Sequence, residues 1–179
     1  SYYKLAYQPN NMTFVVVGNL DPEVMVSAIK NQIKSFPPGR EFSHAIEDEP
    51  PVLAPRTTVG LFPKLGETRV EIGFPTIKLT DPDLYALDLL AYVLGEGDGA
   101  VFTIEIRDRG LASEISAANY TPHYIDGTFS INFNADPRDI FKAKKAILAI
   151  LERVKQNGVG EEQLARAKKQ LLASSAMSH

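Results

Sequence analysis

The chain has 179 residues, of which 44% are hydrophobic and 23% are charged, an ordinary composition for a globular domain that buries a core. Its net charge of −3 gives no electrostatic basis for binding nucleic acid or an anionic membrane. The absence of cysteine excludes disulfides and thiolate metal sites. No apolar stretch reaches the ~20 residues of a membrane span. We expect one domain over residues 1–179, excised from a longer protein.

The first predicted unit is a strand followed by a helix. Residues 12–19 (MTFVVVGN) form a β-branched run that is typical of a buried strand. Asp21 is a favourable N-cap for the following helix, and Pro22 suits its first turn. The apolar face of this helix is expected to hold Met25, Ile29, Ile33 and Phe36. Residues 40–55, which are polar, acidic and rich in proline, are expected to connect this βα unit to the remainder.

The rest of the chain is predicted to contain blocks of strands and helices. Strands are expected at residues 57–62, 67–75, 112–120 and 127–135, and apolar and polar residues alternate in the second and the fourth. Helices are expected at 79–97, 100–109, 136–158 and 160–174. The buried face of the helix at 136–158 is expected to hold Ile140, Ala143, Ile147, Ile150, Leu151 and Val154. Gly95 is expected to end its helix in a left-handed conformation, and Asp126-Gly127 indicates a hairpin turn. The resulting order, β-α-β-β-α-α-β-β-α-α, predicts an α+β fold. The predicted fold is a two-layer α/β sandwich with a mixed or antiparallel sheet and helices packed on one face.

The three histidines are the first candidates for metal or acid–base chemistry. His44 and Glu47 have the spacing of half a His-x-x-Glu-His zinc motif, but Asp48 stands where the second histidine is needed. We interpret His44 as an exposed loop residue, His123 as a turn residue beside aromatic side chains, and His179 as a terminal residue. No calcium loop or nucleophile elbow is present. The chain is therefore predicted to carry no catalytic residue and no metal site.

Gly95, Gly97 and Gly99 form the glycine-rich stretch GEGDG. A phosphate loop would need a lysine and a hydroxyl residue after the last glycine, and a dinucleotide fingerprint would need a preceding strand. Here a predicted helix precedes the glycines, which argues against an independent nucleotide or small-molecule binder. Two interpretations stay open: a helix–turn–helix junction that needs positive φ, and a loop that touches a bound peptide or a neighbouring domain.

Four segments together resemble the zinc metallopeptidases of the insulinase, pitrilysin and mitochondrial-processing-peptidase family, which belong to the inverzincins. They are YYKLAYQPNNMTFVVVGNLDP at the start, DPDLYALDLLAYVLGEGDG, IEIRDRGLASEISA, and ILERVKQNGVGEEQLARAKKQLLAS near the end. The resemblance runs in order through nearly the whole chain. It implies a two-layer α/β sandwich that occurs in pairs enclosing a chamber for peptides.

The same resemblance implies a non-metal-binding, C-terminal-type domain of one half of such a peptidase. The family's His-x-x-Glu-His motif would lie upstream of Ser1, so zinc belongs to the parent protein and this fragment, without a cofactor, is expected to be inactive alone. The implied partners are a peptide or protein substrate, the upstream metal-bearing domain, and a second homologous half or subunit. The implied substrate-binding residues are Gly95, Gly97, Gly99 and Arg107.

Ser113 departs from the pattern of the half that assists catalysis. In that half an arginine is followed six or seven residues later by a tyrosine, and both contact the substrate. Arg107 matches the arginine, but Ser113 stands at the tyrosine position. Two interpretations follow: the chain is the second domain of a metal-bearing half, or it is a structural and assembly module from an inactive paralogue. The GLAS and NYTPHYIDG segments favour the first.

Overall fold

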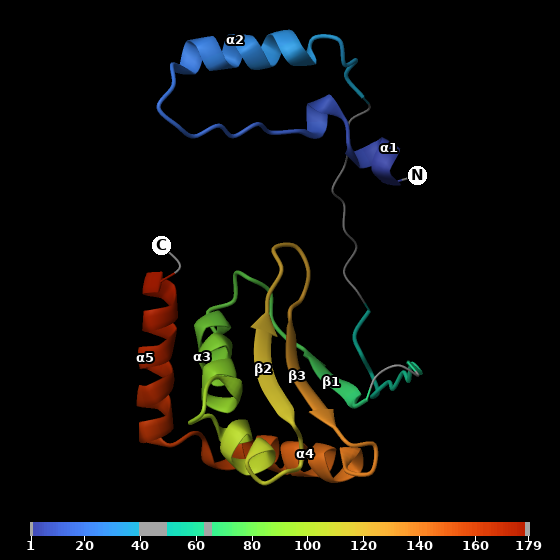
Figure 1. Cartoon of the computed structure of the whole chain (residues 1–179), viewed down its shortest axis with the longest axis vertical. Coiled ribbons are helices and arrows are strands. Elements are labelled where there is room, and N and C mark those ends of the chain that lie inside the picture. Colours follow the sequence, from blue (N-terminus) through green and yellow to red (C-terminus); the bar gives the residue numbers. More distant parts are fainter. Residues whose placement is uncertain (1, 40–49, 63–65, 178–179) are drawn as a thin grey trace. The chain divides into compact units, whose positions relative to one another are not determined.

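The computed structural model describes residues 2–39, 50–62 and 66–177 of the chain. It forms two compact units, Ser1–Ile46 and Glu47–His179 (Figure 1). The first contains α1 (Tyr2–Ala6), η1 (Pro9–Asn11) and α2 (Pro22–Ile33), and the second contains β1 (Thr68–Pro75), α3 (Leu84–Gly95), η2 (Thr103–Arg107), β2 (Glu114–Tyr120), β3 (Thr128–Ala135), α4 (Ile140–Asn157) and α5 (Glu161–Met177).

The boundary between the units falls inside the predicted connector, residues 40–55. Residues 40–49 of that connector lie outside the described part of the chain. Residues 50–55 are exposed and carry no helix or strand. That the whole chain acts as a single domain stays a prediction.

The first unit confirms the predicted helix as far as Ile33 and corrects the predicted strand. Phe36, predicted on the apolar face of this helix, lies beyond its end and is exposed, and α2 has no buried residue. Asp21 caps α2, because its Oδ1 accepts hydrogen bonds from the backbone N–H groups of Glu23 (2.8 Å) and Val24 (3.2 Å). Residues 12–19, predicted as a buried strand, instead carry no helix or strand. A strand needs a neighbouring strand to pair its backbone, and no strand occurs in the described residues of this unit.

The second unit contains an antiparallel sheet of three strands in the order β1-β3-β2. All three lie where the sequence predicts them. The strand predicted at residues 57–62 is wrong: this segment carries no helix or strand and pairs with no strand in the described part of the chain, and Val59 and Leu61 are exposed. Gly60 interrupts this short apolar run, which leaves few side chains to pack across to another strand.

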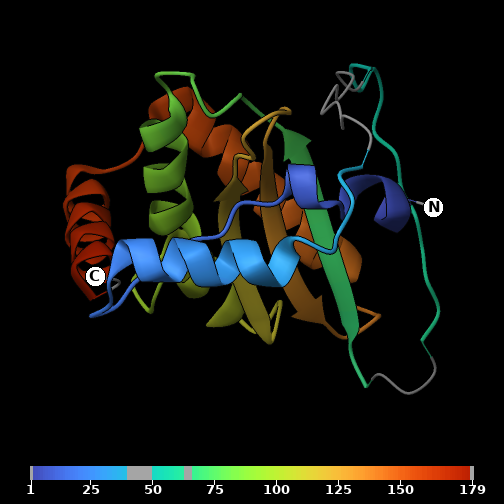
Figure 2. The same cartoon turned by 90° about the horizontal axis from the view of Figure 1, so that it is seen from above.

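One face of the sheet is apolar and covered by helices. On β3 the buried side chains alternate, with Phe129, Ile131 and Phe133 pointing to the covered face. They join one hydrophobic cluster with residues of α3, α4 and α5. Figure 2 shows α4 crossing behind the sheet. The core stripe predicted for α4 is confirmed, with Ala143, Ile147 and Ile150 buried. This arrangement confirms the two-layer α+β fold, with helices packed on one face of the sheet.

The β2–β3 hairpin is present, but Asp126-Gly127 does not form a tight two-residue turn. The connection spans residues 121–127. The N–H of Gly127 donates to the carbonyl of Ile77 (2.9 Å), and its carbonyl accepts from the N–H of Thr76 (2.9 Å). Gly127 therefore serves a non-local contact: an added Cβ would lie 2.7 Å from the Thr76 hydroxyl oxygen.

Gly95 is required for close packing and does not provide the left-handed cap that its position predicts. It is the last residue of α3, and the positive φ (+78°) falls two residues later, at Gly97. A Cβ built on Gly95 would lie 2.1 Å from the backbone nitrogen of Ala117 in β2. The last turn of α3 consequently packs directly on the backbone of the edge strand.

We predict that Gly95→Ala destabilises the protein by about 3 kcal/mol, because the added methyl would force α3 and β2 apart in a close-packed region. Gly66→Ala is the matched control, since an added Cβ there meets nothing within 4 Å. Urea unfolding of both variants measures the difference. Equal unfolding midpoints for the two variants would contradict the packing role of Gly95.

Candidate functional site

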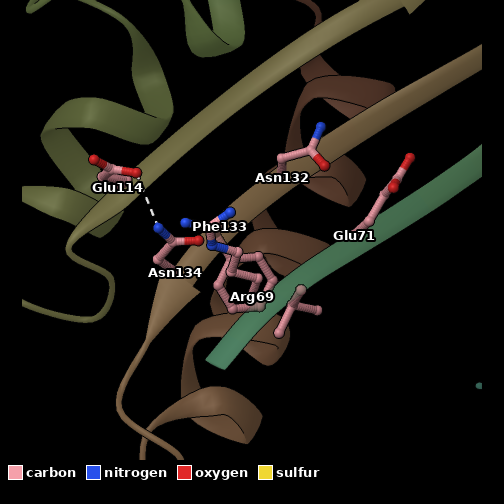
Figure 3. A pocket seen from close by; sticks show the side chains of 7 residues that line it. Arg69, Glu71, Glu114, Asn132, Phe133 and Asn134 are labelled. Carbon is pink, nitrogen blue, oxygen red and sulfur yellow. Dashed lines mark hydrogen bonds between the residues drawn. The ribbon is translucent and has the colours of Figure 1, made fainter. Parts of the chain in front are cut away.

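Within the second unit, the face of the sheet opposite the helices is polar and hollowed at one end. A hollow of about 520 Å³ opens there, lined by Arg69, Val70 and Glu71 of β1, Glu114 of β2, and Asn132, Phe133 and Asn134 of β3 (Figure 3). Strand register places Arg69 opposite Asn134, which in turn lies opposite Glu114. These three side chains form a polar row across all three strands.

Only part of the polar surface of the hollow is used internally. The Asn134 amide donates to Glu114 Oε2 (2.9 Å), as the dashed line in Figure 3 shows. The Asn132 amide donates to the Ser130 hydroxyl (3.3 Å). The backbones of Arg69 and Glu71 pair with β3, but their side chains form no hydrogen bond or ion pair within the described residues. The hollow therefore contains the guanidinium of Arg69 and the carboxylate of Glu71 on one face of β1, and neither group is paired with another described residue.

Ser113, which the sequence places at the family's tyrosine position, lies at the same end of the sheet. Its hydroxyl donates to Glu67 Oε2 (3.0 Å), and its N–H donates to the Asn134 carbonyl (2.9 Å). The side chain thus links the residue before β1 to the residue before β2. Ser113 directly precedes Glu114, so it borders the hollow.

The glycine-rich stretch makes room for two side chains of α5. An added Cβ at Gly97 would lie 2.5 Å from the Gln170 amide nitrogen, and one at Gly99 would lie 2.9 Å from Arg166 Cδ. The positive φ of Gly97 confirms that this helix–turn–helix junction needs glycine. The sequence predicts the junction but not its partners, because α5 lies some 70 residues further along the chain.

Arg166 binds the C-terminal end of α3. Its guanidinium donates to the carbonyls of Glu96 (2.9 Å), Val93 (3.3 Å) and Tyr92 (3.4 Å), and also to the Gln170 side chain (2.6 Å). The last carbonyls of a helix have no partner within the helix and form the negative end of its dipole. The half-buried guanidinium of Arg166 satisfies both requirements.

We predict that Arg166→Met lowers the free energy of unfolding by about 2 kcal/mol, because it leaves helix-terminal carbonyls without donors. Lys168→Met, at an exposed position of the same helix, is the control and is expected to change stability by less than about 0.5 kcal/mol. Thermal unfolding followed by circular dichroism compares the two. Similar losses in both variants would argue against the capping role.

The short helix predicted at residues 100–109 is present but contains a π-helical turn, η2. The N–H of Asp108 donates to the Thr103 carbonyl (2.9 Å), and the N–H of Leu111 donates to the Ile106 carbonyl (3.0 Å). The Thr103 hydroxyl also donates to the carbonyl of Gly97 (3.0 Å), which ties the turn to the glycine loop. π-turns are frequent at functional sites.

Arg107, the predicted substrate-binding arginine, is held by two carboxylates. Its guanidinium donates to Asp108 (3.0 Å) and Asp98 (3.3 Å), and its side chain is 40% exposed. These hydrogen bonds, with that to Asp108 the stronger, raise the pKa of Arg107 above its ordinary value. Arg107 therefore joins the glycine loop to the end of the π-turn.

Glu105 forms the connection between the π-turn and α4. Arg153 donates to both of its carboxylate oxygens, at 2.9 and 2.5 Å. These hydrogen bonds hold the pKa of Glu105 below its ordinary value, against the opposing effect of burial. The bidentate geometry fixes the π-turn more firmly than a single hydrogen bond would.

We predict a pH-dependent contribution from this pair. Because folding lowers the pKa of Glu105, the stabilisation is present above the carboxyl's ordinary value of 4.5 and is lost as pH falls through the lower folded value. Glu105→Gln should therefore reduce stability by up to about 1 kcal/mol at neutral pH, and the difference should shrink in acid. Urea unfolding across this pH range measures it, and a difference independent of pH would contradict the pairing.

The histidine candidates do not form a site in the described part of the chain. His44, with its neighbours Glu47 and Asp48, and His179 lie outside the described residues. His123 is exposed, and its ring packs edge-on against Tyr124 with centroids 4.6 Å apart. Over residues 2–39, 50–62 and 66–177, no three His, Cys, Asp or Glu side chains gather in a way that could hold a metal ion. No helix within those ranges is long and apolar enough to cross a membrane.

Comparison with known proteins gives one family match. A family model described as "Peptidase M16 inactive domain" matches residues 1–171. An uncharacterized zinc protease of Streptomyces coelicolor is 26% identical, over 98% of this chain and 39% of its own length. A protease from Helicobacter pylori shares the fold with a TM-score of 0.81 and 24% identity, over 98% of this chain and 43% of that one.

A solved peptidase M16 inactive domain from Pseudomonas fluorescens is also similar. It is 28% identical, with a TM-score of 0.57, over 62% of this chain and 27% of that one. The chain thus spans less than half the length of each of these three relatives.

Proposed function

The chain belongs to the family of peptidase M16 inactive domains, and on that premise we propose that it forms a non-catalytic wall of a peptide-binding chamber in a zinc-dependent protease. The observation that carries this proposal is the open polar face of the sheet with its hollow. The hydrolytic step would belong to a metal-bearing domain of the parent protein. The donor groups of the described residues do not fit a zinc ion, so no step through zinc is assigned to this chain.

The chemistry of the open face suits an extended peptide. A peptide backbone presents alternating N–H donors and C=O acceptors, and the side-chain amides of Asn132 and Asn134 offer both kinds of group. Arg69 can pair with a carboxylate in a bidentate manner. Gly73, Ala118 and Ser130 form the adjoining cross-strand row, and their small side chains let a peptide approach the sheet closely.

The strand order offers a second route to the same ligand. β3 is central, and within the described residues β1 pairs with β3 alone. The outer edge of β1 therefore carries backbone groups that an added strand could pair with. Main-chain pairing would give affinity for many sequences, and the side chains of the hollow would select among them.

Gly97, Gly99 and Arg107 are kept as a proposed second contact with substrate, whereas Gly95, buried against β2, would contribute to it only by positioning the loop. Gly97 and Gly99 are exposed, and the adjoining π-turn holds Arg107 at the surface. Their packing against α5 and β2 makes the loop a rigid surface. Arg107→Gln should weaken peptide binding if the guanidinium contacts the ligand, and unchanged affinity would remove Arg107 from the proposed contact.

We predict that Arg69→Gln weakens binding of an unstructured peptide by about tenfold, because one charge-assisted contact is lost. Arg138→Gln is the control, since Arg138 is an exposed arginine that pairs with Asp136 by a 2.9 Å hydrogen bond. Fluorescence anisotropy with a labelled peptide mixture measures both affinities. Equal affinities for the two variants, or no binding by the unaltered chain, would overturn peptide recognition by this face.

Ser113 supports a second candidate, a structural and assembly module from an inactive paralogue. Its hydroxyl is committed to Glu67 and lacks the reach and the phenol of the family's tyrosine. Zinc-dependent peptide hydrolysis by the parent protein would exclude this candidate. Zinc-dependent hydrolysis by the 179-residue chain alone would overturn the proposal that the chain is non-catalytic.

A further inference from the structure

We infer that the open face of the sheet selects extended peptides by the order of their side chains. The preferred peptide carries an acidic and a basic residue two positions apart at one end and a large apolar residue at the other. This inference rests on the proposed function, because it takes the open face as a peptide surface. It goes further by assigning the class of peptide that this face recognises.

The open face changes its chemistry in steps along the strands. Strand register arranges its side chains in four cross-strand rows, named here by their β1 residues Arg69, Glu71, Gly73 and Pro75. Charged and amide side chains occupy the first two rows, and the Gly73 row holds small side chains. No charged residue occurs in the Gly73 and Pro75 rows. A ligand that lies along the strands therefore meets different chemistry at each end.

The charged end of the face presents both signs of charge. Arg69 and Glu71 are exposed, and neither side chain is paired with another described residue. A lone cation on the ligand would be attracted by Glu71 but repelled by Arg69. A lone carboxylate would be attracted by Arg69 but repelled by Glu71 and Glu114. Because like-charge contacts are costly at an interface, a ligand with both charges in the complementary order fits best.

The spacing of the two charges on β1 matches that of an extended peptide. In any extended chain, alternate side chains point to the same side and lie about 7 Å apart. Arg69 and Glu71 are such a pair, since they are two residues apart in β1. A peptide that runs along this strand can therefore place an acidic residue over Arg69 and, two positions away, a basic residue over Glu71.

The opposite end of the face offers an apolar surface. Tyr120 is 68% exposed and lies across from Thr128, which in turn lies across from the exposed Pro75. The Thr128 methyl carbon lies 3.5 Å from the position of a Cβ built on Gly73, so this methyl borders the Gly73 row. A phenol ring, a methyl and a proline ring together suit a leucine or an aromatic side chain of the ligand.

The length of the face sets the length of the peptide. Arg69 and Pro75 are six residues apart on β1, which corresponds to about 20 Å of extended chain. An extended peptide of about seven residues covers this distance. Its acidic residue is then the first, its basic residue the third and its large apolar residue the seventh, counted from the Arg69 end. The small side chains of the Gly73 row leave space for the middle of the peptide.

Fluorescence anisotropy of the 179-residue chain with synthetic peptides tests the inference. Two probes, one for each chain direction, carry glutamate, lysine and leucine at these three positions and serine elsewhere. The probe that binds better should bind about tenfold more tightly than the same peptide with glutamate and lysine exchanged. Moving its leucine by one position, to the side that points away from the sheet, should also weaken binding. Equal affinities for these peptides would overturn the inference.

Variants of exposed side chains provide the reciprocal test. Arg69→Glu/Glu71→Arg should reverse the preference, so that the charge-exchanged peptide binds more tightly. Tyr120→Ser should weaken binding of the better probe about fivefold. Tyr85→Ser is the matched control, because Tyr85 is 77% exposed but belongs to α3, on the other side of the sheet. An unchanged preference in the double variant, or equal losses in the two tyrosine variants, would contradict the inference.

The labelled peptide mixture separates this inference from the proposed function. Binding of the mixture, without any preference among the designed probes, would refute the inference and leave the proposed function standing. Failure of the mixture and of every probe to bind would refute both. Because the probes differ only in the order of their residues, this comparison needs no altered protein and does not depend on how well a variant folds.

Discussion

The second unit depends on the contact between the last turn of α3 and the backbone of β2. Gly95 permits this approach, since any Cβ would overlap the nitrogen of Ala117. Arg166 then holds the same helix end from the other side, by donating to its free carbonyls. Helix, edge strand and α5 are thereby fixed together at one point. The glycine loop and the π-turn follow directly from it in the chain, so their positions are set by this contact.

This packing divides the sheet into two chemically different faces. The helices pack on the apolar face, where Val70, Ile72 and Ile115 are half-buried, and the opposite face keeps its polar side chains free of internal packing. A polar surface with an uncommitted arginine and carboxylate contributes nothing to the core, so its side chains are available for a ligand. This division makes the open face, and not the glycine loop, the best-supported peptide surface: the glycines are already occupied by Gln170 and Arg166.

The first unit shows the opposite situation, because its apolar residues lack a core. Asp21 caps α2 and fixes where the helix begins, which is a local interaction that needs no partner. The β-branched run before it has no local way to satisfy its backbone or to bury its side chains. The two halves of the chain therefore differ in autonomy. The second unit has its own core, whereas the first has the pattern of a sheet component without a sheet.

The sequence by itself determined the features that depend on neighbouring residues. Period-two alternation located β1 and β3, the apolar stripe located the buried face of α4, and the ordered motifs identified the family. Tertiary structure alone decided which runs become strands, since residues 12–17 and 57–62 have strand composition but pair with no strand in the described part of the chain. It also decided that Gly95 serves the approach of β2, that Arg166 caps α3, and that Arg69 and Asn134 share a hollow. Each of these depends on groups distant in the chain, and a linear pattern records a residue's propensity but not the partner that folding brings to it.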